Sequence, residues 1–416
     1  MRKLIFILFL FVTASTRAQD TLTLSLAGTD SIFINNNLML LAARYKVDAS
    51  KALIQQARLW GNPTLSTEWN LYNPDKDKFF DAGKNGQKII GLEQVVSLAG
   101  KRNKLIQLAK ANAQFSQFEF YELMRALKTE LHNSYYAIYF SSQVIEKLDK
   151  QVVQMGVIIE AMEVQSKKGN IPLKEVLRLK ALYYQLNHDR AQVVSDLFDA
   201  QQTLLTLLQV SAPVKVIPSQ TELDRYSTSK LDLKSLLDKA LANRPDLKMT
   251  ENLSQQADLN YSLQKRLSVP DLHIGAVYDQ AGSYVNNYSG ITLGFDLPVF
   301  NRNQGNIKYA KAVSGQYKAE VQNKTNSVSN EVSATYQKLK LIEESYRKVD
   351  ADFGTNIELL NEGYLSNFQK RNISMIEFTD FFEAYNTSIQ ELNKLKEKRI
   401  QTYEELNYVI GEELFR

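Results

Sequence analysis

Apolar residues recur along most of the chain with the spacing of a coiled coil. Between Val176 and Leu207 they follow alternating steps of three and four, and only Arg190 interrupts the series. This is the period of helices that pack in a left-handed supercoil, and the remaining positions are mostly polar, as a solvated face requires. Residues 131–148 and 378–410 repeat the pattern. Helices of about 40 residues would be about 60 Å long, so the pattern predicts a rod or tube.

Two windows show the two-residue period of β-strands instead. In the first window, residues 64–72 alternate and residues 88–97 are apolar and β-branched. In the second, residues 272–279 and 291–297 place apolar side chains on one face and small or polar ones on the other, with a loop at 281–287 between them. Each window predicts a hairpin with strands of about ten residues. Such strands suit a membrane-spanning barrel, although a soluble hairpin fits the alternation equally well.

Glycine and proline are scarce and unevenly distributed, which sharpens this interpretation. The 416 residues include only 8 Pro and 17 Gly, and ten of the 17 Gly lie within residues 61–100 and 275–305, in or directly beside the hairpins. Because both residues interrupt helices, their scarcity elsewhere favours long unbroken helices between the hairpins.

The chain also contains two similar sequence repeats. Residues 169–175 recur as 371–377, and the exits of the two hairpins match, each at an offset of about 200 residues. We therefore divide the chain into a first repeat (19–210, hairpin about 62–97), a linker or equatorial segment (211–230) and a second repeat (231–416, hairpin about 269–299). Two hairpins give only four strands, which cannot close a barrel, and closure is required in lipid. The repeat therefore predicts a symmetric oligomer that shares one barrel.

The N-terminus has the features of an export signal. Arg2 and Lys3 precede an apolar run, and small residues end at Ala18, so residues 1–18 are expected to be removed on secretion. The run is too short for a membrane anchor. Losing Arg2, Lys3 and Arg17 lowers the net charge from +4 to +1, so a nucleic-acid partner is not expected. The chain has no Cys, which excludes disulfides and thiol chemistry.

Three segments make the chain resemble outer-membrane efflux proteins of the TolC family over essentially its whole mature length. They are Ala-Leu-Ala-Asn-Arg-Pro-Asp-Leu at 240–247, the proline-led strand start at Pro270, and residues 290–305. The end of the third segment is similar to the Pro-Leu-Phe-Asn-Arg-Asn-Gln-Gly pattern of the heavy-metal (CzcC and CusC) branch, with Val299 in place of Leu. The N-terminal helix lacks the matching Arg-Pro-Asp-Leu, and no Cys follows the signal to carry a lipid anchor.

The resemblance implies a mainly α protein with a membrane β-barrel portion. Three chains would form a homotrimer with a 12-stranded barrel in the lipid of the outer membrane, continued by an α-helical tunnel through the periplasm. It also implies an exit duct for an inner-membrane pump of the resistance–nodulation–division (RND) class, joined by a periplasmic adaptor (membrane fusion) protein. Heavy-metal cations are the expected cargo, with drugs or metabolites as the alternative.

The expected functional residues lie at the turns between the long helices, which would form the periplasmic tip. We expect contact with the adaptor and pump at these tip residues: Gly169, Asn170, Ile171, Arg371, Asn372 and Ile373. Relatives narrow the entrance with carboxylates, and Asp380 and Glu377 have the corresponding spacing here, with Glu175 as the first-repeat counterpart of Glu377. In a trimer each would form a ring of three like charges that gates the tube and attracts cations. The alternative is that all three are ordinary solvated acids.

Signatures of catalysis or of bound cofactors are missing from the sequence. The three histidines, His132, His188 and His273, are isolated, and no nucleophile elbow, Walker loop or dinucleotide fingerprint occurs. Met155 and Met162 are more typical of core packing than of a copper shuttle. We therefore expect no enzyme activity, no cofactor and no metal site. A periplasmic coiled-coil adaptor and a secreted hydrolase with paired carboxylates remain as alternatives; the double hairpin argues against the first and the heptads against the second.

Overall fold

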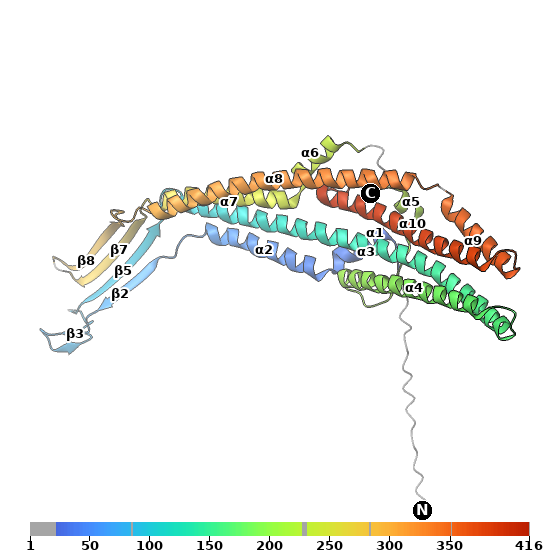
Figure 1. The fold of residues 1–416 in the computed structure, drawn as a ribbon. Helices are drawn as coiled ribbons and strands as arrows, with labels where there is room; N and C mark the ends of the chain where they lie inside the picture. The colour runs from blue at the N-terminus through green and yellow to red at the C-terminus, as the bar shows by residue number, and fades with distance from the viewer. Residues whose placement is uncertain (1–21, 85, 227–230, 283, 351, 416) are drawn as a thin grey trace, which may run out of the picture.

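The computed structural model describes residues 22–84, 86–226, 231–282, 284–350 and 352–415. The predicted signal peptide, residues 1–18, therefore lies outside the described residues. The molecule is a long curved body with a sheet at one end and two helix–helix turns at the other (Figure 1). Helix α3, Lys101–Lys167, has 67 residues and is therefore about 100 Å long. The predicted rod-like architecture is confirmed.

Both repeats place a helix before a hairpin and long helices after it. The first repeat contains α2 (Leu38–Arg58), α3 and α4 (Leu173–Leu208). The second contains α7 (Pro245–Leu267), α8 (Gln304–Arg347), α9 (Phe353–Gln369) and α10 (Met375–Ile410). One difference was not predicted: α3 is continuous, whereas its counterpart in the second repeat ends at Arg347 and resumes at Phe353.

The heptad positions form the helix interfaces. Leu179, Leu186 and Leu204 of α4 are almost completely buried, as are Phe378 and Ile389 of α10. The two arginines that break the heptads, Arg190 and Arg399, form ion pairs with acids of neighbouring helices, Asp149 of α3 and Glu343 of α8. The Arg190 pair is exposed at the edge of the seam, whereas the Arg399 pair is largely buried, so that each charge lies beside a carboxylate.

Four strands form one antiparallel sheet in the order β2-β5-β7-β8. Their bounds are Thr64–Trp69 for β2, Lys88–Val96 for β5, Leu272–Ala281 for β7 and Asn286–Phe295 for β8. The last strand begins inside the loop predicted at 281–287, because Ala281 pairs with Asn286 and extends the ladder. A small pair, β3 (Tyr72–Asn73) with β4 (Lys78–Phe79), lies in the β2–β5 connection.

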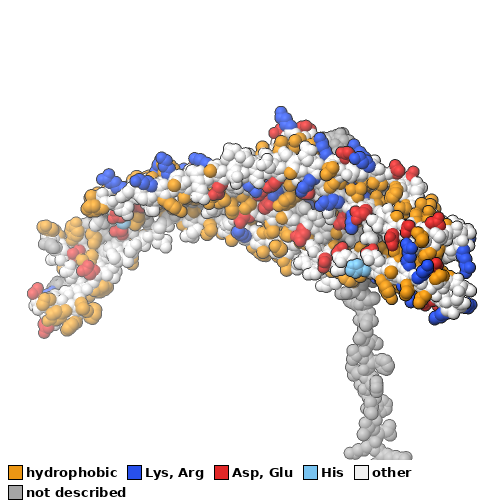
Figure 2. Space-filling model, viewed as in Figure 1, with side chains coloured by type: hydrophobic (Ala, Val, Ile, Leu, Met, Phe, Trp, Pro, Cys, Tyr) orange, Lys and Arg blue, Asp and Glu red, His pale blue; other side chains and the backbone are white. Residues whose placement is uncertain are grey.

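The register gives the sheet two chemically different faces. On the first face Leu65 pairs with Leu92, and Ile274 pairs with Leu293, so that apolar side chains lie side by side. Leu65 and Leu293 are each 67% exposed and Ile291 is 81% exposed, which is costly in water and favourable in lipid. Figure 2 shows hydrophobic side chains at the surface of the sheet end of the molecule. The second face carries mainly small and polar residues, with four larger side chains, Ile89, Val95, Val277 and Tyr288, among them. The small and polar members are Thr64, Ser66, Glu68, Gly91, Glu93, His273, Gly275, Asp279, Gly290, Thr292 and Gly294.

The middle of the body holds the main core, where the two repeats meet. Strand β1 (Leu22–Leu24) pairs in parallel with β6 (Val214–Val216), followed by α5 (Gln220–Asp224) and α6 (Leu233–Asn243). The segment 211–230, expected to be a linker, is therefore partly a structured piece of this central region. Helix α1 (Leu26–Asn36) packs against this central region. Four buried tyrosines belong to the core: Tyr135, Tyr136, Tyr226 and Tyr403. No described helix is both long and apolar enough to cross a bilayer.

Candidate functional site

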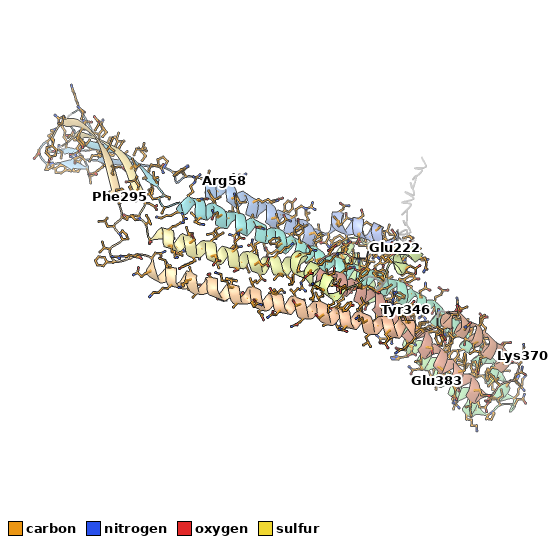
Figure 3. All side chains as sticks on the ribbon, turned by 90° about the horizontal axis from the view of Figure 1, so that it is seen from above. Arg58, Glu222, Phe295, Tyr346, Lys370 and Glu383 are labelled. Atoms are coloured by element: carbon orange, nitrogen blue, oxygen red, sulfur yellow. The ribbon has the colours of Figure 1, made fainter. Side chains whose placement is uncertain are left out.

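The two tip turns have the same backbone structure. In the first, Gly169 has a positive φ of 77° and the Asn170 amide donates to Gln165 Oε1 at 2.8 Å. In the second, Arg371 has a positive φ of 61° and the Asn372 amide donates to Asn367 Oδ1 at 3.1 Å. Four of the six predicted tip residues, Gly169, Asn170, Arg371 and Asn372, are exposed, and Ile171 and Ile373 are half-buried beneath them. The tip lies at the end of the body marked by Lys370 and Glu383 in Figure 3.

Glu377 has a structural role at the start of α10. Its carboxylate accepts the Ser374 backbone N–H at 2.8 Å, and the Ser374 hydroxyl accepts the Glu377 N–H at 3.2 Å, which makes a capping box. Hydrogen bonds from Ser374 lower the pKa of Glu377, so the side chain stays ionised at neutral pH. A capped carboxylate is held near its own helix end, which makes Glu377 less free to line a pore than its sequence position suggested.

Asp380 connects the two helical hairpins. Its Oδ1 lies 3.5 Å from a guanidinium nitrogen of Arg178 on α4, and the two side chains are 67% and 48% exposed. An exposed pair of this kind contributes less than about 1 kcal/mol, so it can break without disturbing the fold. Arg178 was not among the predicted site residues, because the partner of an acid on another helix cannot be identified from spacing.

Glu175 lies in a cavity between the hairpins. The cavity has a volume of about 480 Å³, and Glu175 and Arg371 line it from different hairpins. Beneath the tip, Phe368 stacks on Phe378 with ring centroids 4.2 Å apart. The structure thus places Glu175 in a mostly apolar cavity between the hairpins, whereas Asp380 is exposed beside Arg178.

A buried ionic cluster in the middle of the body was missed by the sequence. His132 of α3 contacts Asp30 of α1 at 2.9 Å and Glu404 of α10 at 3.0 Å, and Tyr226 donates to Glu404. Burial alone lowers the pKa of His132, but the two carboxylates outweigh it and raise the pKa to about 9. The histidine is therefore charged at neutral pH. Its partners are 102 and 272 residues away, so no local motif reveals them.

The Arg-Pro-Asp-Leu segment forms a second buried cluster. Arg244, which is 2% exposed, donates to both Asp246 carboxylate oxygens, to Glu331 of α8 at 2.6 Å and to the Val409 carbonyl of α10. Burial raises the pKa of Asp246, but the hydrogen bonds from Arg244 and Lys324 reverse this and hold it well below its usual range. One guanidinium thereby joins α7 to α8 and to the end of α10.

Metal-binding geometry was not found in the part of the chain that the structure describes. No group of three or more His, Cys, Asp or Glu side chains there is arranged to hold an ion. The carboxylates of the His132 cluster instead accept hydrogen bonds from one charged imidazole and a tyrosine.

A sheet with one lipid-compatible face, joined to long helices of which α3 is about 100 Å long, and built from two similar repeats, is the architecture of an outer-membrane channel subunit. The chain belongs to the Outer membrane efflux protein family, whose match covers residues 31–209 and 236–352. The protein is accordingly located in the outer membrane, with its helical part in the periplasm. The predicted family and fold class are confirmed.

Individual relatives agree with this assignment. The chain is 23% identical over 291 residues to the cobalt-zinc-cadmium resistance protein CzcC of Cupriavidus metallidurans, a match that spans 68% of this chain and 65% of the relative. The fold matches CusC with a TM-score of 0.75 at 15% identity, covering 93% of this chain and 92% of CusC. It also matches the CmeC channel of Campylobacter jejuni with a TM-score of 0.75 at 12% identity, covering 94% and 86%.

Proposed function

We propose that the protein is the exit duct of a tripartite efflux pump and carries heavy-metal cations from the periplasm to the exterior. Three copies would close a barrel of twelve strands, since each chain supplies one four-stranded sheet with open edges at β2 and β8. A periplasmic adaptor would join the tip to an inner-membrane RND-type pump. In this proposal the duct has no catalytic role.

The observation that carries the cation assignment is the charge on the second face of the sheet. When the apolar face meets lipid, this second face lines the lumen of the barrel. It presents three carboxylates, Glu68, Glu93 and Asp279, and a histidine, His273, that contacts Glu93 at 2.8 Å. Within the described strands no Lys or Arg lies on this face. In a trimer the three would repeat threefold, and a low-dielectric wall strengthens their attraction for cations. The similarity to CzcC, named for cobalt, zinc and cadmium, supports the same cargo.

Ion selectivity in planar bilayers tests the duct and its cargo charge. In a salt gradient we expect a reversal potential that favours cations, and the combined change Glu68→Gln, Glu93→Gln and Asp279→Asn should move it towards zero. Asp238→Asn on α6, an exposed acid far from the sheet, is the matched control. An unchanged reversal potential in the triple variant would contradict the assignment of cations as the cargo. Purification of the protein as a soluble monomer, in place of a detergent-extracted trimer, would contradict the assignment as a duct.

The gate at the tip remains a proposal with its own test. Glu377→Gln keeps the capping box and removes the charge, and Asp380→Asn removes the acid that faces Arg178. If these residues form rings at the entrance, the double variant should conduct more and be blocked less by divalent cations. Arg178→Gln is the companion variant, because it breaks the ion pair with Asp380 but keeps the Asp380 carboxylate. In this variant conductance should rise, while divalent cations should still block the channel. Wild-type conductance and block in every variant would contradict the gate.

Drug or metabolite efflux is the alternative cargo within the same family. The fold matches CmeC and CusC with the same TM-score of 0.75, so the fold alone does not select between the cargos. Cross-linking in cells, followed by identification of the adaptor and pump that co-purify, separates the two cargos because the pump selects the substrate.

A further inference from the structure

Four short connections join the helices to the sheet, and together they form one level of the molecule. They are residues 58–63, 97–104, 265–271 and 296–305. All four lie where the helical body meets the sheet, at the end of the strands that points to the periplasm (Figure 1). The lipid-facing side of the sheet therefore ends at this level.

These connections expose apolar side chains that soluble loops rarely expose together. Phe300 is 92% exposed, Leu297 is 79% exposed and Trp60 is 57% exposed. Further exposed members of the set are Leu59, Leu267, Val269 and Val299. Trp in particular prefers the boundary between hydrocarbon and headgroups. The apolar face of the sheet thus continues into the connections.

The same connections are basic. They contain seven Lys or Arg residues and two acids, Asp271 and Asp296. Asp271 is already engaged with the buried Lys101 at 2.8 Å. The loops at the opposite end of the sheet, residues 70–84, contain three basic and three acidic residues, so the excess of positive charge belongs to the periplasmic level alone.

Three arginines are fixed at this level by backbone carbonyls. Arg102 donates to the Arg58 carbonyl at 3.0 Å, and its guanidinium lies 4.5 Å from the centre of the Trp60 ring. Arg266 donates to the Ala99 carbonyl at 2.5 Å, and Arg302 donates to the Pro298 carbonyl at 3.3 Å. Each guanidinium carries five N–H donors, so these bonds leave others for an acceptor such as a phosphate.

We propose that this basic and aromatic level, defined by the four connections, binds the headgroups of anionic phospholipids in the periplasmic leaflet of the outer membrane. The apolar side chains enter the acyl boundary while Arg and Lys reach phosphate, an arrangement that the continuous lipid-facing sheet places at headgroup depth. The inference depends on the outer-membrane location of the family and is independent of the cargo. An adaptor protein would be the other occupant, and the test below separates the two.

The two tryptophans make the test direct, because the chain has only Trp60 and Trp69. Trp60 lies at the periplasmic level and Trp69 at the far end of β2, and the six-residue strand between them is about 17 Å long. The purified trimer is placed in phosphatidylethanolamine vesicles that contain a small fraction of brominated phosphatidylglycerol or, separately, brominated phosphatidylethanolamine. Trp69→Phe reports on Trp60 alone, and Trp60→Phe reports on Trp69 alone.

We expect brominated phosphatidylglycerol to quench Trp60 about twofold more than brominated phosphatidylethanolamine does. Trp69 should be quenched equally by the two brominated lipids. Replacing the exposed cations in Arg58→Gln, Lys265→Gln and Arg302→Gln should abolish the preference, whereas Lys76→Gln, Lys78→Gln and Lys84→Gln at the far end should preserve it. Circular dichroism and oligomer mass check that each variant is assembled.

Equal quenching of Trp60 by the two lipids would overturn the proposal. It would equally be overturned if the Arg58, Lys265 and Arg302 variant kept the lipid preference but lost cross-linking to the adaptor, because the level would then be a protein-docking surface. Bilayer conductance should stay cation-selective in this variant, so a failure here is distinguishable from a failure of the proposed duct.

Discussion

His132 provides the most quantitative test of the structure. It is 5% exposed in its side chain and lies between Asp30 and Glu404, which raise its pKa from 6.5 to about 9. A group with a raised pKa stabilises the fold fully below its unfolded pKa, and that stabilisation is lost as the pH rises through the folded value. The window here is therefore about pH 6.5 to 9. At about 1.4 kcal/mol per pKa unit, the shift corresponds to about 3 kcal/mol at its maximum.

The perturbation is His132→Gln, which keeps a hydrogen-bonding side chain and removes the charge. Thermal unfolding of the helical part is followed by circular dichroism at 222 nm between pH 6 and pH 10. At pH 6 we expect the apparent Tm to fall by about 6 °C, at about 2 °C per kcal/mol for a large domain. At pH 10 the wild-type histidine is neutral as well, so the difference in Tm between the two proteins should become small.

His188→Gln is the matched control, since His188 is exposed on α4. It should change the Tm little at any pH. If His132→Gln lowered the Tm by the same amount at pH 6 and pH 10, the histidine would act through packing alone. The charge assigned to the cluster would then be wrong.

Three other changes test the remaining structure. Arg244→Ala leaves Asp246 as a buried charge without its main partner and should destabilise the fold by about 3–5 kcal/mol, which lowers the urea midpoint of unfolding. A midpoint near that of the wild type would contradict the role of Arg244 in joining α7 to α8 and α10. Gly169→Ala should lower the stability of the first tip turn by about 1 kcal/mol and Arg371→Gly should raise that of the second by a similar amount, because both positions have positive φ; local hydrogen exchange measures each, and shifts of the same sign would contradict the shared turn. Ser374→Ala removes a helix cap and should lower the free energy of local opening at the start of α10 by about 1 kcal/mol, measured as faster amide hydrogen exchange there.

The sequence predicted the elements of the fold well because their signals are local. The heptads identified α4 and α10, and the alternation identified β2 and β7, since periodicity depends only on neighbouring residues. The interruption between Arg347 and Phe353 carries no proline, which explains why it was not anticipated. The pairing of Leu22–Leu24 with Val214–Val216 spans about 190 residues, and no pattern within either short strand reveals it.

The candidate site was predicted only in part for the same reason. The tip turns were visible as a repeated segment, and the structure gives both turns the same hydrogen bonds. The partners of the predicted acids were not visible: Ser374 holds Glu377 through a local cap, whereas Arg178 reaches Asp380 from another helix. Whether the acids gate the entrance depends on where three chains place them, which a single sequence does not encode locally.

The open edges of the sheet also have a genetic consequence. Each subunit ends in β2 on one side and β8 on the other, so every subunit must be paired on both edges before the ring closes. A variant that damages one edge, such as a proline in the middle of β8, should therefore spoil the trimers that it enters. If such a subunit were made in equal amount with the normal one, only about one trimer in eight would be intact. The damaged allele should act as a dominant inhibitor of efflux, although it leaves the normal gene untouched.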